Sequence, residues 1–134
     1  MIDLDAHTIA VALHLLGVAI WIGGQLLMAS LVGVLRSIDP TAPRLAARRF
    51  GQLAWPAYAL TVVTGIWLVW LVDVADASTG YQATVGVKLL LVALSGVAAF
   101  VHAQANNLAV RAATGAGALL AGLGALFCGV LLVT

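Results

Sequence analysis

Charge is what this sequence has least of. Only 8% of its 134 residues are charged, and no residue from 6 to 35 carries a full charge. Hydrophobic residues make up 63% of the chain, and the mean hydropathy is +1.13. These values lie far outside the range of soluble domains, so a water-soluble fold is excluded. The net charge of +1 is uninformative about partners, and we expect no nucleic-acid partner.

Cysteine is almost as scarce. The one cysteine, Cys128, excludes an intramolecular disulfide and any metal cluster built from several cysteines. The chemistry of this chain must therefore depend on a few polar side chains within apolar segments.

Long apolar segments are what the sequence does have. A bilayer crossing needs about 20 apolar residues, so the chain has room for four crossings with short connections. The breaks fall at a proline-rich cluster near Asp39, at a polar loop over residues 76–84, and at Asn106 and Asn107. We predict membrane helices over residues 6–35, 50–72, 85–105 and 112–133. The expected fold is all-α: a polytopic membrane protein forming an antiparallel four-transmembrane-helix bundle, as a single domain over residues 1–134.

The positive charges predict an orientation. Arginines and lysines in short loops stay on the cytoplasmic side of a membrane. The predicted first loop holds Arg36, Arg44, Arg48 and Arg49, and the predicted third loop holds Arg111. Both termini are therefore expected outside the cytoplasm, in a bacterial cytoplasmic (inner) membrane. Lys88 departs from this pattern, which makes it a candidate for function.

Polar side chains recur at seven-residue intervals, which returns them to nearly the same helix face. One stripe lies on the first predicted helix and another on the third, and both are expected to face the bundle interior because lipid-facing charge is costly. The two stripes are His7, His14, Trp21 and Met28, and then Lys88, Ser95 and His102. Small residues that permit close helix packing are Gly23, Gly24, Gly65, Gly96, Ala99, Gly115, Gly122 and Gly129.

Depth limits which of these groups can meet. At about 1.5 Å per residue, His14 lies about 12 Å below the outer end of its predicted helix, Lys88 about 5 Å below its own and His102 about 25 Å. His14 and Lys88 are then within reach of each other. The same spacing argues against one metal held between His14 and His102, unless the first helix begins later.

The first helix also carries a resemblance. Residues 13–24, LHLLGVAIWIGG, resemble the first-helix signature of the copper-resistance-D (CopD) family and of the related HemJ-type protoporphyrinogen oxidases. Further matches are Arg48 and Arg49 before the second helix, Pro56 and Gly65 within it, and the Val-Lys-Leu run around Lys88. Where HemJ-type proteins carry an arginine and a Tyr-His pair, this chain has Met-Ala-Ser over residues 28–30, so the CopD-like assignment fits better.

The resemblance implies a haem b or copper site that uses His14 and, with it, Lys88. Our leading hypothesis is a haem b protein that exchanges electrons with quinone or a redox partner, or that acts on a tetrapyrrole. The second axial ligand stays open among Lys88, His7, water and His102, so whether the protein is an enzyme stays open too.

Two other functions compete with haem binding. Copper transport would use His7, His14, Met28 and Cys128 in succession. A non-catalytic subunit, or a homo-oligomer, would use the glycine-rich last helix for docking. Each residue also has a structural explanation: His14 as an interhelical hydrogen bond, Trp21 as packing, and Arg48 and Arg49 as topology signals that could also hold lipid phosphates or haem propionates.

Overall fold

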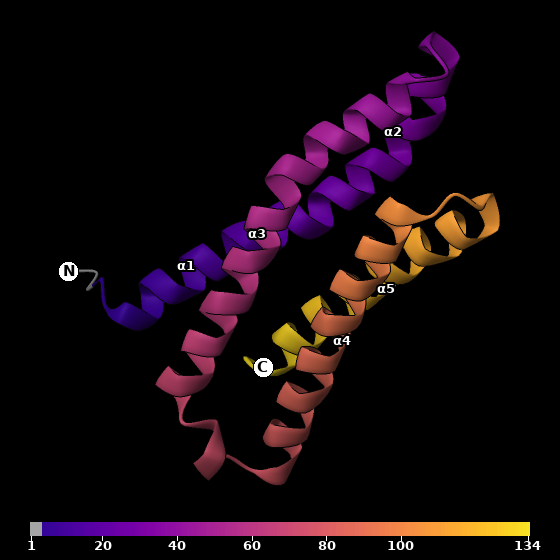
Figure 1. Ribbon diagram of the computed structural model, residues 1–134. Coiled ribbons are helices and arrows are strands. Elements are labelled where there is room, and N and C mark those ends of the chain that lie inside the picture. The colour runs from indigo at the N-terminus through magenta and orange to yellow at the C-terminus, as the bar shows by residue number, and fades with distance from the viewer. Residues whose placement is uncertain (1–3) are drawn as a thin grey trace. The chain divides into compact units, whose positions relative to one another are not determined.

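The computed structural model describes residues 4–134, and every regular element in that range is helical (Figure 1). In order these are α1 (Ala6–Val18), the π-helical turn η1 (Ala19–Gly23), α2 (Gly24–Ile38), α3 (Ala42–Val72), the short 3-10 turn η2 (Val74–Asp76), α4 (Thr79–Gln104) and α5 (Leu108–Leu131).

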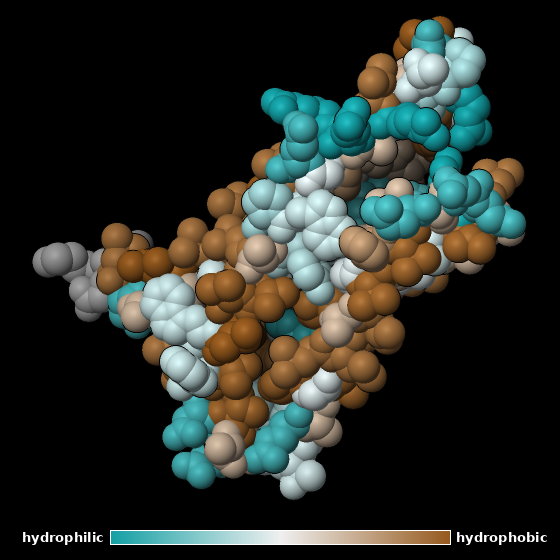
Figure 2. Space-filling model, in the orientation of Figure 1, coloured by the Kyte–Doolittle hydropathy of each residue, from teal (hydrophilic) through white to brown (hydrophobic). Residues whose placement is uncertain are grey.

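Four helical stretches are long and apolar enough to cross a membrane. The first is α1, η1 and α2 taken together, followed by α3, α4 and α5. This confirms the all-α class and the number of predicted crossings. Hydrophobic side chains cover the lengths of the helices and hydrophilic ones gather at their ends (Figure 2). Large apolar residues such as Phe127, 62% exposed, lie on the outside, as lipid contact requires.

Contacts between residues divide the chain into two units, residues 1–72 and 73–134. In unit 1, α3 packs against α1, η1 and α2, and in unit 2, α4 packs against α5. Each unit is an antiparallel pair of spans joined by a short connection (Figure 1).

The first span of unit 1 is continuous but contains one π-helical turn, η1. Asp5 caps its start by accepting a hydrogen bond from the Thr8 amide at 2.7 Å. Close packing against α3 depends on Gly17, since a Cβ there would overlap the Thr61 hydroxyl and lie 2.8 Å from the Ala57 carbonyl oxygen. Gly24 makes a similar approach to the Phe50 ring. Small residues therefore set the spacing within unit 1.

The second span begins earlier than predicted. Helix α3 starts at Ala42, so Arg44, Arg48 and Arg49 lie in its first turns, and the predicted long first loop is wrong. The connection is a tight turn in which the Asp39 carboxylate accepts hydrogen bonds from the Thr41 amide and hydroxyl at 2.7 and 2.6 Å. Arginine is a good helix former, and its charge at the membrane boundary does not interrupt a helix that extends into water.

The boundaries of unit 2 also shift. Ser78 caps α4, whose first residue is Thr79, so the predicted loop over residues 76–84 is wrong beyond Ser78. Asn107 caps α5 through the amides of Ala109 and Val110, and this places Arg111 in the first turn of a helix rather than in a loop. Polar residues near a helix start favoured a loop in the sequence pattern, whereas here they form the caps and first turns of helices.

Candidate functional site

His14 lies in the middle of α1 and faces α3. Its Nδ1 is 2.9 Å from the Thr61 carbonyl oxygen and 3.1 Å from the Thr64 hydroxyl. The ring also packs against Gly65, where a Cβ would lie 3.2 Å from the imidazole Cε1. The half-buried imidazole is thus held by three residues of the neighbouring helix.

The hydrogen bonds of His14 identify its tautomer. A carbonyl oxygen can only accept, so Nδ1 must carry the proton that it shares with Thr61. The Thr64 hydroxyl donates to the Leu60 carbonyl at 2.6 Å, which leaves its oxygen to accept from the same Nδ1–H. In the neutral imidazole, Nε2 then carries the lone pair. Metal-binding histidines are oriented by this same kind of Nδ1–H to carbonyl bond.

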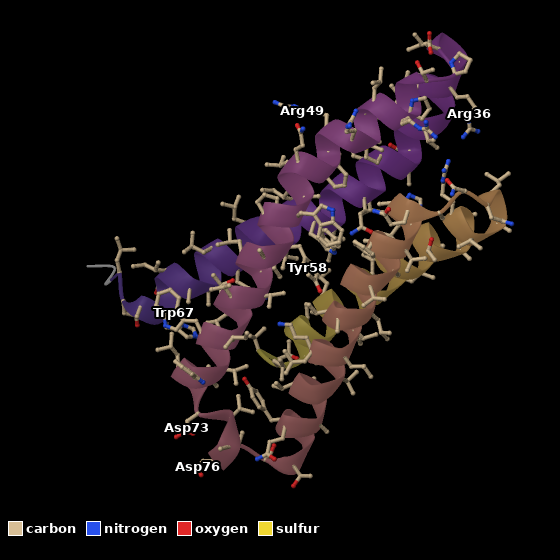
Figure 3. The ribbon with its side chains drawn as sticks, in the orientation of Figure 1. Arg36, Arg49, Tyr58, Trp67, Asp73 and Asp76 are labelled. Carbon is tan, nitrogen blue, oxygen red and sulfur yellow. The ribbon has the colours of Figure 1, made fainter. Side chains whose placement is uncertain are left out.

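An aromatic cluster lies beside the π-helical turn. The Trp21 ring centroid is 4.6 Å from that of Tyr58 and 5.3 Å from that of Trp55, and only 6% of Trp21 is exposed. Tyr58 lies midway along α3 (Figure 3). Trp21 therefore faces α3 as His14 does, which confirms that these two members of the first stripe share a face. π-helical turns occur often at functional sites.

The other members of the first stripe are less enclosed. His7, in the first turn of α1, is exposed, so the expectation that it faces the interior is wrong for this position. Met28 is half-buried on α2. The side-chain nitrogen of Gln25, one turn beyond Trp21, is buried without a hydrogen-bond partner among the described residues, and the sequence pattern did not single it out.

The stripe on α4 faces α5 along its whole length. The Ser95 hydroxyl donates to the Ala118 carbonyl at 2.7 Å, and the side chain is 1% exposed. His102 packs against Gly115, where an added Cβ would lie 2.9 Å from the His102 Nδ1. Lys88 packs against Gly129, where an added Cβ would lie 3.2 Å from the Lys88 Nζ.

This packing follows the seven-residue period of both helices. Seven-residue steps from His102 reach Ser95 and Lys88, and the same steps from Gly115 lead to Gly129 through Gly122. The predicted shared face of α4 is confirmed, and its polar side chains pack on small residues of α5.

Lys88 and His102 lie at the two ends of the α4 stripe. Because α4 begins at Thr79, Lys88 lies about 14 Å along its helix rather than about 5 Å. It packs near the C-terminal end of α5, at Gly129, and the negative dipole end of that helix favours an ammonium group. His102 donates from Nδ1 to the Arg111 carbonyl at 2.7 Å, close to the end of α4.

The predicted site residues belong to the two units in turn. His14 and Trp21 lie on the α1–α3 contact of unit 1, and Lys88 and His102 lie on the α4–α5 contact of unit 2. Arg48 and Arg49 are exposed in the first turns of α3. Residues 4–134 contain no group of three or more His, Cys, Asp or Glu side chains placed to hold a metal ion.

The two threonines of α3 that contact His14, Thr61 and Thr64, were missed by the sequence analysis. Their signal is an alternating three- and four-residue spacing of small and hydroxyl residues, all buried: Ala54, Ala57, Thr61 and Thr64. This spacing marks one face of a helix. It identifies the interior face of α3, but not which polar group of α1 the face receives.

Comparison with protein-family models, with curated proteins and with solved structures gives no match for this chain. The CopD-like resemblance of residues 13–24 stays a prediction. The geometry around His14 is therefore the basis for assigning a function.

Proposed function

We propose that the chain is an integral membrane protein that binds haem b, with His14 as an axial ligand. The observation that carries the proposal is the bond from the His14 Nδ1–H to the Thr61 carbonyl at 2.9 Å. That bond fixes the ring orientation and makes Nε2 the basic nitrogen, which is the form that iron takes. The Thr64 hydroxyl at 3.1 Å supports the same tautomer.

The depth of His14 supports a functional role. It lies about 12 Å from the start of α1, and Thr64 lies about 12 Å from the end of α3. The depth of the contact between these two residues is therefore the same whichever helix it is counted along. With a hydrocarbon core about 30 Å thick, this level is inside the membrane. Ionisable groups there are costly and are usually functional.

The donor chemistry suits haem because the porphyrin supplies four nitrogens and the protein needs to add only one or two. When bound, haem would supply one-electron redox chemistry at the iron. The part of this chain is to orient one imidazole through Thr61 and Thr64. Trp21, Lys88 and the arginines are further candidates for contact with the group, and electron exchange with quinone or a partner protein is the activity we infer.

The test is an absorption spectrum with metal analysis of the full-length protein, produced with ample haem and purified in a mild detergent. We expect a Soret band in the wild type, its loss in His14→Ala, and its retention in His7→Ala, which removes an exposed histidine of the same helix. A His14→Gly variant should regain the band when imidazole is added, which separates a lost ligand from a lost fold. A weaker bond to Nδ1 in Thr64→Val should shift the midpoint potential while the band remains.

Absence of a Soret band from wild-type protein that is folded and haem-supplied would end the haem proposal. Colourless protein with stoichiometric copper would point to copper handling, and protein with neither would point to a subunit role. Retention of the full spectrum in His14→Ala would show that another residue is the ligand.

We also propose that the arginine-rich end of unit 1 faces the cytoplasm of a bacterial cell, with both termini outside. The arginines lie in helical turns rather than in a loop, but they are within a few residues of the membrane boundary, where the positive-inside rule applies.

A further inference from the structure

The end of unit 1 where α2 meets α3 has an unbalanced positive charge. Residues 36–49 contain four arginines, Arg36, Arg44, Arg48 and Arg49, and one acidic residue, Asp39. The Asp39 carboxylate is already engaged by the Thr41 amide and hydroxyl of its own turn. Arg36, Arg44 and Arg48 form no hydrogen bond or ion pair within residues 4–134. The guanidinium charges are therefore available to an anion.

Beside this cluster, α3 forms a shallow groove of about 330 Å³ lined by Arg49, Phe50, Gln52 and Leu53. Arg49 donates to the Gln52 side-chain oxygen at 2.8 Å, so the N–H groups of the Gln52 amide are not used in this bond. The polar wall of the groove thus presents N–H donors, and the other wall presents a ring and a leucine. Arg49 projects from α3 on the opposite side of the helix pair from Arg36 (Figure 3).

The groove lies at the level of the lipid headgroups. The uncharged part of α3 runs from Phe50 to the end of the helix at Val72, about 34 Å at 1.5 Å per residue, which is close to the thickness of the hydrocarbon core. Arg49 is then at the boundary, and Leu53 lies about one turn inside it. Hydrophilic side chains gather at this end of unit 1 and apolar ones follow along the helices (Figure 2).

We propose that this groove is a binding site for one anionic phospholipid. The phosphate is held by Arg49 and the Gln52 amide, and an acyl chain lies along Phe50 and Leu53. Guanidinium groups bind phosphate through paired, charge-assisted hydrogen bonds, and the other arginines favour a headgroup with net negative charge over a zwitterionic one. The apolar wall favours a lipid over free phosphate, because it is of use only to a ligand with a hydrocarbon chain.

The experiment is native mass spectrometry of the full chain in a neutral detergent, titrated with phosphatidylglycerol or phosphatidylcholine of matched chains. We expect phosphatidylglycerol to bind more tightly, and Arg49→Gln to weaken its binding by about fivefold while leaving phosphatidylcholine unchanged. Leu53→Ser should weaken phosphatidylglycerol binding, and millimolar inorganic phosphate should not displace the lipid.

The matched control is Arg36→Gln, which removes the same charge at the same end of unit 1 but outside the groove. It should change phosphatidylglycerol binding by less than about twofold, since only long-range attraction is lost. Equal losses in Arg36→Gln and Arg49→Gln would show a diffuse charge effect and overturn the site. So would equal affinity for the two lipids, or displacement by inorganic phosphate. Circular dichroism of each variant verifies its helical content, and none of these outcomes depends on haem.

Discussion

Replacing Gly17 with alanine should separate α1 from α3 and loosen His14. The added Cβ would overlap the Thr61 hydroxyl, which can rotate, but it would also lie 2.8 Å from the Ala57 carbonyl oxygen, which cannot. Ordinary contact begins near 3.4 Å, so the helices must move apart by several tenths of an ångström. One turn away, the 2.9 Å bond from His14 to Thr61 would lengthen toward about 3.5 Å, the outer limit of a hydrogen bond.

The expected loss of stability follows from two opposing terms. Overpacking against backbone costs about 2–3 kcal/mol, at the upper end of its usual range, and the change from glycine to alanine within a helix returns up to about 1 kcal/mol. The net loss in the free energy of unfolding is therefore about 1–2 kcal/mol. It can be measured by titrating the protein from a mild detergent into dodecyl sulfate while following helicity, with Trp21 fluorescence as a second probe.

The control is Gly23→Ala, six residues along the same span, where an added Cβ meets no atom within 4 Å. It should leave the free energy of unfolding unchanged or raise it by up to about 1 kcal/mol. If both variants lose the same stability, or if Gly17→Ala is as stable as the wild type, the close approach of α1 to α3 is not what holds unit 1 together.

Two further predictions concern the turn of unit 1 and the helix contact of unit 2. Hydrogen bonds from the Thr41 hydroxyl and amide hold the pKa of Asp39 below its ordinary 3.8, so their contribution to the stability of the fold is present above that pH and is lost as the pH falls through the lower folded-state pKa. Thr41→Val should raise the pKa of Asp39 in an NMR titration of its carboxyl carbon, and an unchanged pKa would contradict the assignment. Ser95→Ala removes the bond to the Ala118 carbonyl and should lower the free energy of unfolding by about 0.5–1 kcal/mol in the same dodecyl sulfate titration. A free energy of unfolding equal to that of the wild type within error would show that glycine packing alone joins α4 to α5.

The heptad spacing predicted which faces of two helices are polar, and the reason is geometric. Residues seven apart share a face in any regular helix, so Lys88, Ser95 and His102 had to point the same way. The helix boundaries were harder to predict, because serine, asparagine and arginine are compatible with loops, caps and first turns alike. Ser78 and Asn107 are caps because the first backbone amides of α4 and α5 need acceptors, and Arg44 is helical because α3 already begins at Ala42.

The candidate site was predicted in part. The position of His14 within an apolar segment singled it out, but its partners Thr61 and Thr64 are 47 and 50 residues away and became visible only when α1 and α3 were packed together. Gly65 was chosen as a small residue for helix contact, and the structure shows that it receives the imidazole. The π-helical turn had no signal in the sequence pattern, because its residues are apolar like their neighbours.

By itself, the sequence determined the medium and the class of fold: segments so poor in charge must satisfy their backbone hydrogen bonds internally, and in a bilayer an α-helix does this within one segment. Tertiary structure decided which side chain meets which. A hydrogen bond such as the one from His14 to Thr61 depends on the distance and rotation between two helices, and those are set by where glycine permits contact. Local periodicity fixes the face of a helix but carries no information about its partner.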